Sequence, residues 1–171
     1  MHGIPHFAIS IALEKNDEII SGIIFDPIKN EIFYAEKGRG SYLNNKRIRV
    51  SSRRNFDEII GLYGCPPFKK VEKNKIFDQI KKASLSIHKL RNYGSASLDF
   101  AYVGTGRLDG LWAFDISNID FASGALIAQE GGALLSNFNG DPKYLDENNV
   151  ICSTSKVYKS VLKSVKPYYM P

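Results

Sequence analysis

The fold of this chain is decided by the stretch Gly94-Ser-Ala-Ser-Leu-Asp-Phe-Ala-Tyr-Val-Gly-Thr-Gly-Arg-Leu-Asp-Gly110, followed by Asp120-Phe-Ala-Ser-Gly-Ala-Leu-Ile-Ala-Gln-Glu-Gly-Gly132. The pattern predicts a helix, a turn, a strand and then a second helix with one carboxylate in its first turn. In an α/β protein, two helix N-termini and a carboxylate beside a sheet edge form a place for a phosphate group and a metal ion. The other Asp and Glu residues show no cluster that would complete such a metal site.

The composition of the 171 residues is ordinary for a globular chain, with 43% apolar and 24% charged residues. This length predicts one domain, or one and a half. The net charge is +5, but Lys and Arg are scattered, which favours a solvated basic surface over a nucleic-acid stripe. We see no signal peptide and no apolar run of the roughly 18 residues that span a membrane, so we expect a soluble cytoplasmic protein.

The N-terminal part of the chain predicts an antiparallel meander. Apolar residues alternate with small ones, and Asn44-Asn45 is a good hairpin turn. Both faces of this meander lean apolar, and no early helix is expected that would cover either face. Another chain or a missing N-terminal helical segment would then cover it, and we favour the missing segment. The expected strands are 7–13, 18–25, 31–36, 41–43 and 46–50.

The pattern changes after a polar joint at residues 51–57, and strands then alternate with helices. This alternation predicts a mixed or parallel sheet layered with helices. We therefore divide the chain into residues 1–52, the meander that remains from an N-terminal α+β half, and residues 53–171, a C-terminal α/β half. The expected helices are 72–84, 95–103, 118–130 and 156–166, and the expected strands are 58–63, 87–92, 108–114, 133–136 and 150–152.

Several motifs together resemble a known family. The chain is similar to the C-terminal two-thirds of an inositol monophosphatase family protein, essentially from Gly3 to about Val165. Each motif is weak alone, but their order and spacing are specific. The motifs are Gly3 to Leu13, Asp26 to Asn30, Tyr34 to Gly40, Asn44 to Ser51, Gly94-Ser95-Ala96, Ile119 to Gly124, and Glu130-Gly131-Gly132.

The resemblance implies a layered α/β/α/β/α fold, similar to that of fructose bisphosphatases and here lacking its N-terminal part. It implies hydrolysis of an inositol- or sugar-phosphate by a water molecule that Mg²⁺ activates, and inhibition by lithium. Asp120 would be a metal ligand, and Gly94, Ser95 and Ala96 would contact the sugar or inositol. Family members are commonly homodimers, so a homodimer is one expected assembly.

The chain departs from the family pattern in ways that affect the metal site. The family's glutamate ligand and its Asp-Pro-x-Asp-Gly-Thr motif would precede Met1. Ala113 stands where many members carry a glutamate that contacts substrate hydroxyls, Ile119 replaces a Trp, and Asn137 replaces an Asp. One carboxylate cannot hold a two-metal cluster. We therefore expect this chain to be weak or inactive alone, and an upstream chain that supplies the other ligands to restore activity.

Some of these residues also have simpler interpretations. Asp120 with Ser117 fits a capping box, and Ser95 fits a helix N-cap. Gly38-Arg-Gly40 is typical of a hairpin turn rather than a phosphate cradle, and Trp112 is expected to be packing. We expect Cys65 and Cys152 to be reduced buried thiols, although a pair is conceivable.

Two rival hypotheses remain beside the phosphatase. The chain would instead be a non-catalytic partner of RNA or of a transcription complex, which some bacterial family members resemble and which a +5 charge permits. Alternatively, it would be the product of a decaying gene, without a function of its own.

Overall fold

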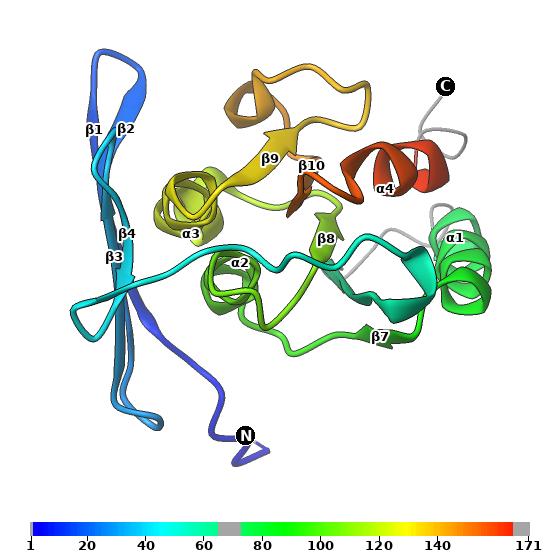
Figure 1. Cartoon of the computed structure of the whole chain (residues 1–171), viewed down its shortest axis with the longest axis horizontal. Coiled ribbons are helices and arrows are strands. Elements are labelled where there is room, and N and C mark those ends of the chain that lie inside the picture. The colour runs from blue at the N-terminus through cyan, green and yellow to red at the C-terminus, as the bar shows by residue number, and fades with distance from the viewer. Residues whose placement is uncertain (1, 65–72, 166–171) are drawn as a thin grey trace.

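The computed structural model describes residues 2–64 and 73–165 of the chain. Two sheets alternate with two helical layers (Figure 1). The first sheet has the order β1-β2-β3-β4-β5, with β1 Ile9–Lys15, β2 Glu18–Asp26, β3 Glu31–Glu36, β4 Gly40–Leu43 and β5 Lys46–Arg47. The second has the order β7-β6-β8-β10-β9, with β6 Ile60–Gly64, β7 Lys89–Arg91, β8 Gly110–Ala113, β9 Ala133–Ser136 and β10 Val150–Thr154.

The helices are α1 Lys73–Ser86, α2 Ala96–Gly104, α3 Asn118–Glu130 and α4 Tyr158–Val165, with short 3₁₀ turns at Phe56–Glu58 and Tyr144–Asp146. Helices α2 and α3 lie between the two sheets, and α1 and α4 lie beyond the second sheet (Figure 1). The proposed division at residues 52 and 53 falls between the two sheets. The turn expected at Pro66-Pro67 and the thiol of Cys65 lie outside the described residues.

The meander forms as the sequence predicts, with antiparallel pairing throughout. Asn44 and Asn45 take positive φ angles of 47° and 65°, which confirms the hairpin turn. The last strand is shorter than expected and ends at Arg47. The backbone N–H of Val50 donates to Gly131 O at 3.0 Å, because the chain leaves the sheet there and runs to the end of α3.

The second sheet is mixed, as expected. Strand β6 pairs in parallel with β7 and β8, whereas β10 pairs antiparallel with β8 and β9. Trp112 is 3% exposed and belongs to the apolar cluster that β8 and β10 share with α1 and α4, which confirms that it is packing.

Helices α2 and α3 pack closely against each other and against the first sheet. A Cβ atom at Gly124 of α3 would lie 2.7 Å from Phe100 Cβ of α2. A Cβ atom at Gly22 of β2 would lie 2.9 Å from Ser123 Cα of α3. Glycine at both positions therefore allows the close approach that places α3 under the meander.

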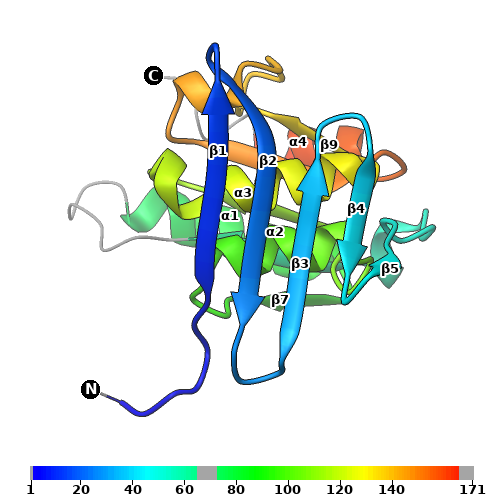
Figure 2. The ribbon, with the colours of Figure 1, turned by 90° about the vertical axis from the view of Figure 1, so that its left-hand side faces the viewer.

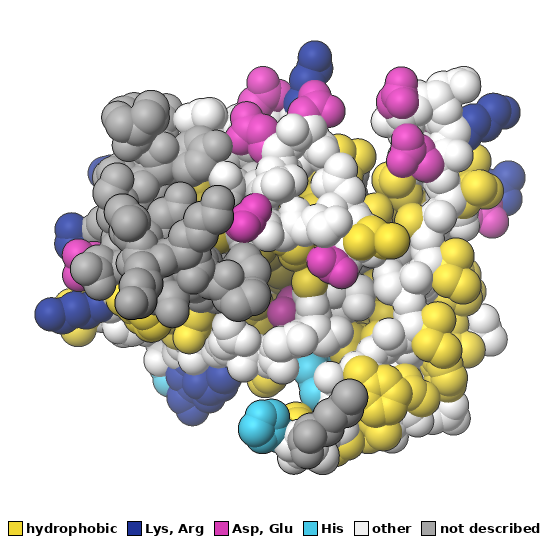
Figure 3. All heavy atoms as spheres, turned by 180° about the vertical axis from the view of Figure 1, so that it is seen from behind, with side chains coloured by type: hydrophobic (Ala, Val, Ile, Leu, Met, Phe, Trp, Pro, Cys, Tyr) yellow, Lys and Arg dark blue, Asp and Glu magenta, His cyan; other side chains and the backbone are white. Residues whose placement is uncertain are grey.

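The expectation that no helix of the chain covers the meander was wrong for its inner face. Its inner face is covered by helices from later in the chain, and Ile24 and Phe33 there are fully buried. Its outer face stays open, and no described residue packs over β1 to β3 in Figure 2. Hydrophobic side chains follow this edge of the molecule in Figure 3. The exposed fractions on this face are Ile9 58%, Ile11 61%, Leu13 57%, Ile23 41% and Ile32 40%. None of the described helices has the length and apolar character that a membrane crossing needs.

Candidate active site

A pocket of about 190 Å³ lies where α2 and α3 begin. It brings Gly94, Ala96 and Asp120 together, as the resemblance implies, whereas Ser95 is not among its lining residues. The pocket also contains side chains that the sequence did not single out as site residues. The described residues that line it are Gly64, Asn92, Gly94, Ala96, Asp99, Ala113, Phe114, Asp115, Ile116 and Asp120.

The loop before α2 shapes one wall of this pocket. Gly94 has φ +87°, and nothing lies within 4 Å of the position that its Cβ would occupy. Glycine is therefore required here by the left-handed backbone rather than by crowding. Ser95 takes an extended conformation at the N-cap position, but its side chain forms no capping hydrogen bond. The first backbone N–H groups of α2 thus remain without a side-chain cap.

Asp120 stands in the first turn of α3 and is exposed. The capping-box interpretation is wrong, because Ser117 forms no side-chain capping hydrogen bond. The contact between the two residues is a backbone one, from Asp120 N to Ser117 O at 2.9 Å. Neighbouring Ile119 is 82% exposed. The Asp120 carboxylate is therefore available to a ligand at a helix N-terminus.

Asp99 and Asp115 are two further carboxyl groups in the pocket. Asp99 is 4% exposed, and burial raises the pKa of its carboxyl group to about 8. Asp115 is exposed and has φ +47°. A signal for Asp99 was present in the sequence, because it is the lone charged residue of an otherwise apolar helix. Such a helix is buried, and its carboxyl group is buried with it.

The oxygen donors of the pocket suit Mg²⁺ in kind but not in number. Mg²⁺ prefers near-octahedral oxygen coordination. Within residues 2–64 and 73–165, no group of three or more His, Cys, Asp and Glu side chains is placed to hold a metal ion. Asp120 alone therefore does not complete a magnesium site in the described part of the chain.

Glu130 at the end of α3 has a structural contact that the sequence did not predict. Its Oε1 accepts from Gly38 N and its Oε2 from Gly40 N, both at 2.7 Å. Gly38 and Gly40 have φ angles of +77° and +84°, which confirms the turn between β3 and β4. The carboxylate thus fixes this turn to α3.

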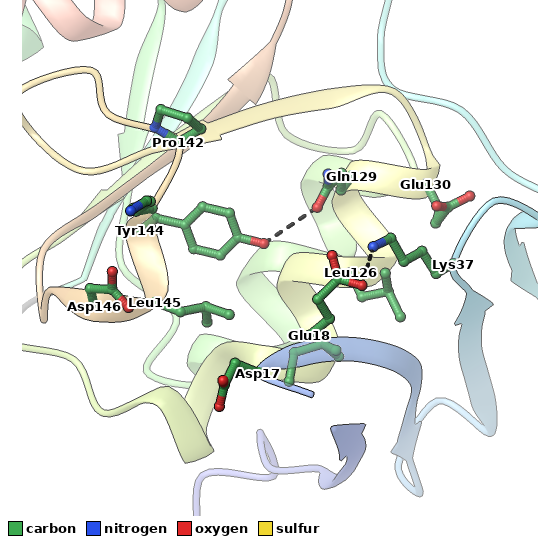
Figure 4. A pocket seen from close by; sticks show the side chains of 12 residues that line it. Asp17, Glu18, Lys37, Leu126, Gln129, Glu130, Pro142, Tyr144, Leu145 and Asp146 are labelled. Carbon is green, nitrogen blue, oxygen red and sulfur yellow. Dashed lines mark hydrogen bonds and ion pairs between the residues drawn. The ribbon is translucent and has the colours of Figure 1, made fainter. Parts of the chain in front are cut away.

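A wider pocket of about 510 Å³ lies on another part of the surface, between the β1–β2 turn, the end of α3 and residues 142–146 (Figure 4). An ion pair of 2.6 Å joins Lys37 to Glu18 there, and the Tyr144 hydroxyl donates to Gln129 Oε1 at 3.3 Å. Its lining includes neither Asp120 nor residues 94–96. We therefore place the candidate site in the smaller pocket.

Cys152 is a free and fully buried thiol in β10, as expected. Burial raises the pKa of this thiol above its ordinary value, so it is an inert packing residue at neutral pH.

The sequence profile of the inositol monophosphatase family matches residues 1–168. The Nus factor SuhB of Pseudomonas aeruginosa is 34% identical over 174 residues, which cover 100% of this chain and 64% of that protein. The inositol-1-monophosphatase of Rhizobium meliloti is 34% identical over 166 residues, which cover 97% of this chain and 62% of that protein. The chain thus spans less than two thirds of the length of these relatives.

Solved structures show the same fold. The extragenic suppressor protein suhB of Bartonella henselae superposes with a TM-score of 0.91 at 33% identity, covering 96% of this chain and 63% of that one. The IMPase of Thermotoga maritima superposes with a TM-score of 0.88 at 34% identity, covering 98% and 63%. The layered α/β fold implied by the resemblance is therefore confirmed.

Proposed function

Because the chain belongs to the inositol monophosphatase family, we propose that it carries the substrate-binding part of a phosphatase that hydrolyses an inositol- or sugar-phosphate. The observation that supports this proposal most is the pocket in which Gly94 and Ala96 lie beside the Asp120 carboxylate. In the reaction, the oxygen of water bonds to phosphorus, the ester P–O bond breaks, and the departing polyol oxygen takes up a proton.

The chemistry of the pocket suits a small phosphorylated polyol. Glycine and alanine leave the backbone accessible to a ligand, and helix N-termini favour a phosphate group. Among the described residues that line the pocket, none is Lys, Arg or His. The phosphate therefore needs another source of positive charge, because the neighbouring carboxylate repels it.

Asp120 is the residue that we propose as a Mg²⁺ ligand. When bound, Mg²⁺ supplies positive charge for the phosphate and activates the attacking water. Lithium is expected to inhibit the complete enzyme. Since the described residues do not complete the site, we expect the chain alone to be weak or inactive.

The missing ligands would come from a segment that covers the outer face of the meander. The relatives are about half as long again as this chain, and their matched region is the C-terminal part. The open face exposes a contiguous set of apolar side chains on β1, β2 and β3. Burying it would stabilise the protein by roughly 25 cal/mol for each Å² removed from water. We propose that this occupant is a further segment, upstream or on a separate chain, rather than a second copy.

Sedimentation of the chain over a range of concentrations distinguishes a further segment from a second copy as the occupant of the outer face. The proposed segment predicts a chain that stays monomeric at micromolar concentration or self-associates without a defined stoichiometry. A stable dimer that Ile11→Lys dissociates would instead identify a second copy as the occupant.

Binding of Mg²⁺, followed by NMR on the ¹⁵N-labelled chain, tests the metal role of Asp120. Because the described residues do not complete the site, we expect weak binding, with a shift of the Asp120 amide at high Mg²⁺ concentration in the wild type that is lost in Asp120→Asn. The matched control is Asp78→Asn, which removes an exposed carboxylate on α1 and leaves the shift unchanged. Equal responses in Asp120→Asn and the wild type would contradict the proposed role.

The second candidate function is a non-catalytic contact with RNA or a transcription complex. The names of several relatives, each a Nus factor SuhB, favour it, and the net charge of +5 permits it. RNA binding that weakens steeply with salt would support this function. Absence of binding at low salt would count against it.

A further inference from the structure

Asp99 differs from the other buried aspartates of the described chain. Asp26 is 1% exposed and pairs with Lys29 Nζ at 2.7 Å. Asp109 is fully buried and accepts from Arg53 Nη1 at 2.9 Å. Asp99 is 4% exposed, and its Oδ1 is buried without a hydrogen-bond partner. A buried polar atom without a partner costs free energy, so this carboxyl group needs an explanation beyond packing.

The position of Asp99 points to a ligand. The residue lies in the first turn of α2 and lines the candidate pocket together with Gly94, Ala96 and Asp120. Because the terminal torsion of an aspartate is broad and nearly two-fold, rotation presents either carboxyl oxygen to the pocket. A ligand in the pocket would thereby give the carboxyl group the partner that the protein does not provide.

The polarity of the pocket restricts the chemistry of that ligand. None of the described residues that line it carries a cationic side chain, and burial raises the pKa of Asp99. A carboxyl group in these surroundings is neutral at pH 7, so it both donates and accepts a hydrogen bond. An alcohol hydroxyl has the same pair of properties, whereas a metal ion needs the charged form.

We propose that Asp99 binds a hydroxyl group of the inositol or sugar part of the substrate. This inference rests on the proposed function and adds the residue that recognises the polyol. Ala113 lines the same pocket with only a methyl group, so it leaves room beside the ligand and offers no hydrogen bond of its own. Asp99 is thus a binding residue, and Asp120 serves the phosphate end.

Titration with myo-inositol, which carries no phosphate and needs no metal, tests the proposal on the complete chain. The readouts are the side-chain carboxyl ¹³C resonance of Asp99 in the ¹³C-labelled wild type and the Gly94 amide. We expect both to shift along one saturation curve. Asp99→Leu should weaken binding about tenfold, because leucine offers neither the donor nor the acceptor, whereas Asp99→Asn, whose amide keeps both, should bind nearly as the wild type does. The control Asp78→Asn should bind as the wild type does.

Three outcomes would overturn the proposal. They are no myo-inositol response in the pocket, a response at Gly94 without one at Asp99, and a response of Asp99 to Mg²⁺ alone that matches that of Asp120. The wild-type titration decides by itself if Asp99→Leu does not fold. If the wild type shows no myo-inositol response at Asp99 and Gly94 but a normal Mg²⁺ response at Asp120, this inference is refuted and the proposed function stands.

Discussion

The two sheets of the molecule differ in how many of their faces are covered. On β8 of the second sheet, the consecutive residues Leu111 and Trp112 are 1% and 3% exposed, because helices lie on both sides. On β2 of the first sheet, Ile24 is fully buried, whereas Ile23 is 41% exposed. Strands of both sheets carry apolar residues on two faces, which is the pattern of a sheet covered twice. The first sheet therefore has the sequence pattern of a sheet covered on both faces, although the described residues cover only its inner face.

Alanine substitutions at Ile24 and Ile23 should show the largest difference between the covered and the open face of the first sheet. Ile24→Ala should lower the free energy of unfolding by about 2–5 kcal/mol, because it leaves a cavity under α2 and α3. Ile23→Ala should cost about 1 kcal/mol or less, because the side chain already meets water. Urea denaturation of both variants measures the difference. Equal costs would mean that the outer face is covered within the chain itself.

Gly22→Ala tests how closely the covered face approaches α3. The added methyl group would lie 2.9 Å from both Ser123 Cα and Ser123 O, which are backbone atoms that cannot rotate away. We expect a loss of about 1–3 kcal/mol in the free energy of unfolding, as is typical of overpacking. Thermal unfolding followed by circular dichroism measures it. Unchanged stability would show that the sheet and α3 are less tightly packed than described.

The pH dependence of the stability of Asp99→Asn tests the burial of this carboxyl group in α2, between the two sheets. Burial raises the pKa of Asp99 from its ordinary value of 3.8 to about 8 in the folded chain. The folded state therefore holds the proton more tightly than the unfolded state, and this stabilisation is full below pH 4 and is lost as the pH rises through 8. The asparagine variant should gain on the order of 1–3 kcal/mol over the wild type at pH 8.

The control for this effect is the pH profile of Asp78→Asn, an exposed position that should follow the wild type. If the difference in the free energy of unfolding between Asp99→Asn and the wild type stays constant from pH 4 to pH 8, the carboxyl group is not buried as described.

Glu130→Gln is expected to have the smallest effect. It keeps the side-chain shape and removes the charge that accepts from Gly38 N and Gly40 N. Because this contact is partly exposed, we expect a loss of only about 1 kcal/mol in the free energy of unfolding. Hydrogen exchange of the Gly38 and Gly40 amides measures it locally, and Glu14→Gln on β1 serves as an exposed control. Unchanged protection of both amides would contradict the assigned contact.

The sequence predicted the elements that local patterns determine. Helix α3 and strand β9 have the expected bounds, and Asn44-Asn45 forms the expected turn. It failed where distant contacts decide, as at Val50, whose bond to Gly131 ends the meander early. The two helices that cover the inner face were predicted as helices, but nothing local indicates that they pack back onto the first sheet.

The candidate site was partly predictable for the same reason. The resemblance placed Gly94, Ala96 and Asp120 in one site, and the structure brings them to one pocket. The side-chain caps expected at Ser95 and Ser117 do not form. The sequence spacing allows such a cap, but it does not fix the serine side chain in the rotamer that a cap needs. Asp99 was missed: its place in an apolar helix indicates burial, but only the packed structure reveals that its Oδ1 has no hydrogen-bond partner.

Release of phosphate from inositol 1-phosphate, with and without Mg²⁺, shows whether the chain needs a further segment to complete its metal site. One sample is the chain alone, and the other contains in addition the N-terminal segment of the Pseudomonas aeruginosa relative that lies outside the matched region. We predict no Mg²⁺-dependent release from the folded chain alone and release in the presence of the segment. Mg²⁺-dependent turnover by the chain alone would show instead that its own residues complete the metal site without a further segment.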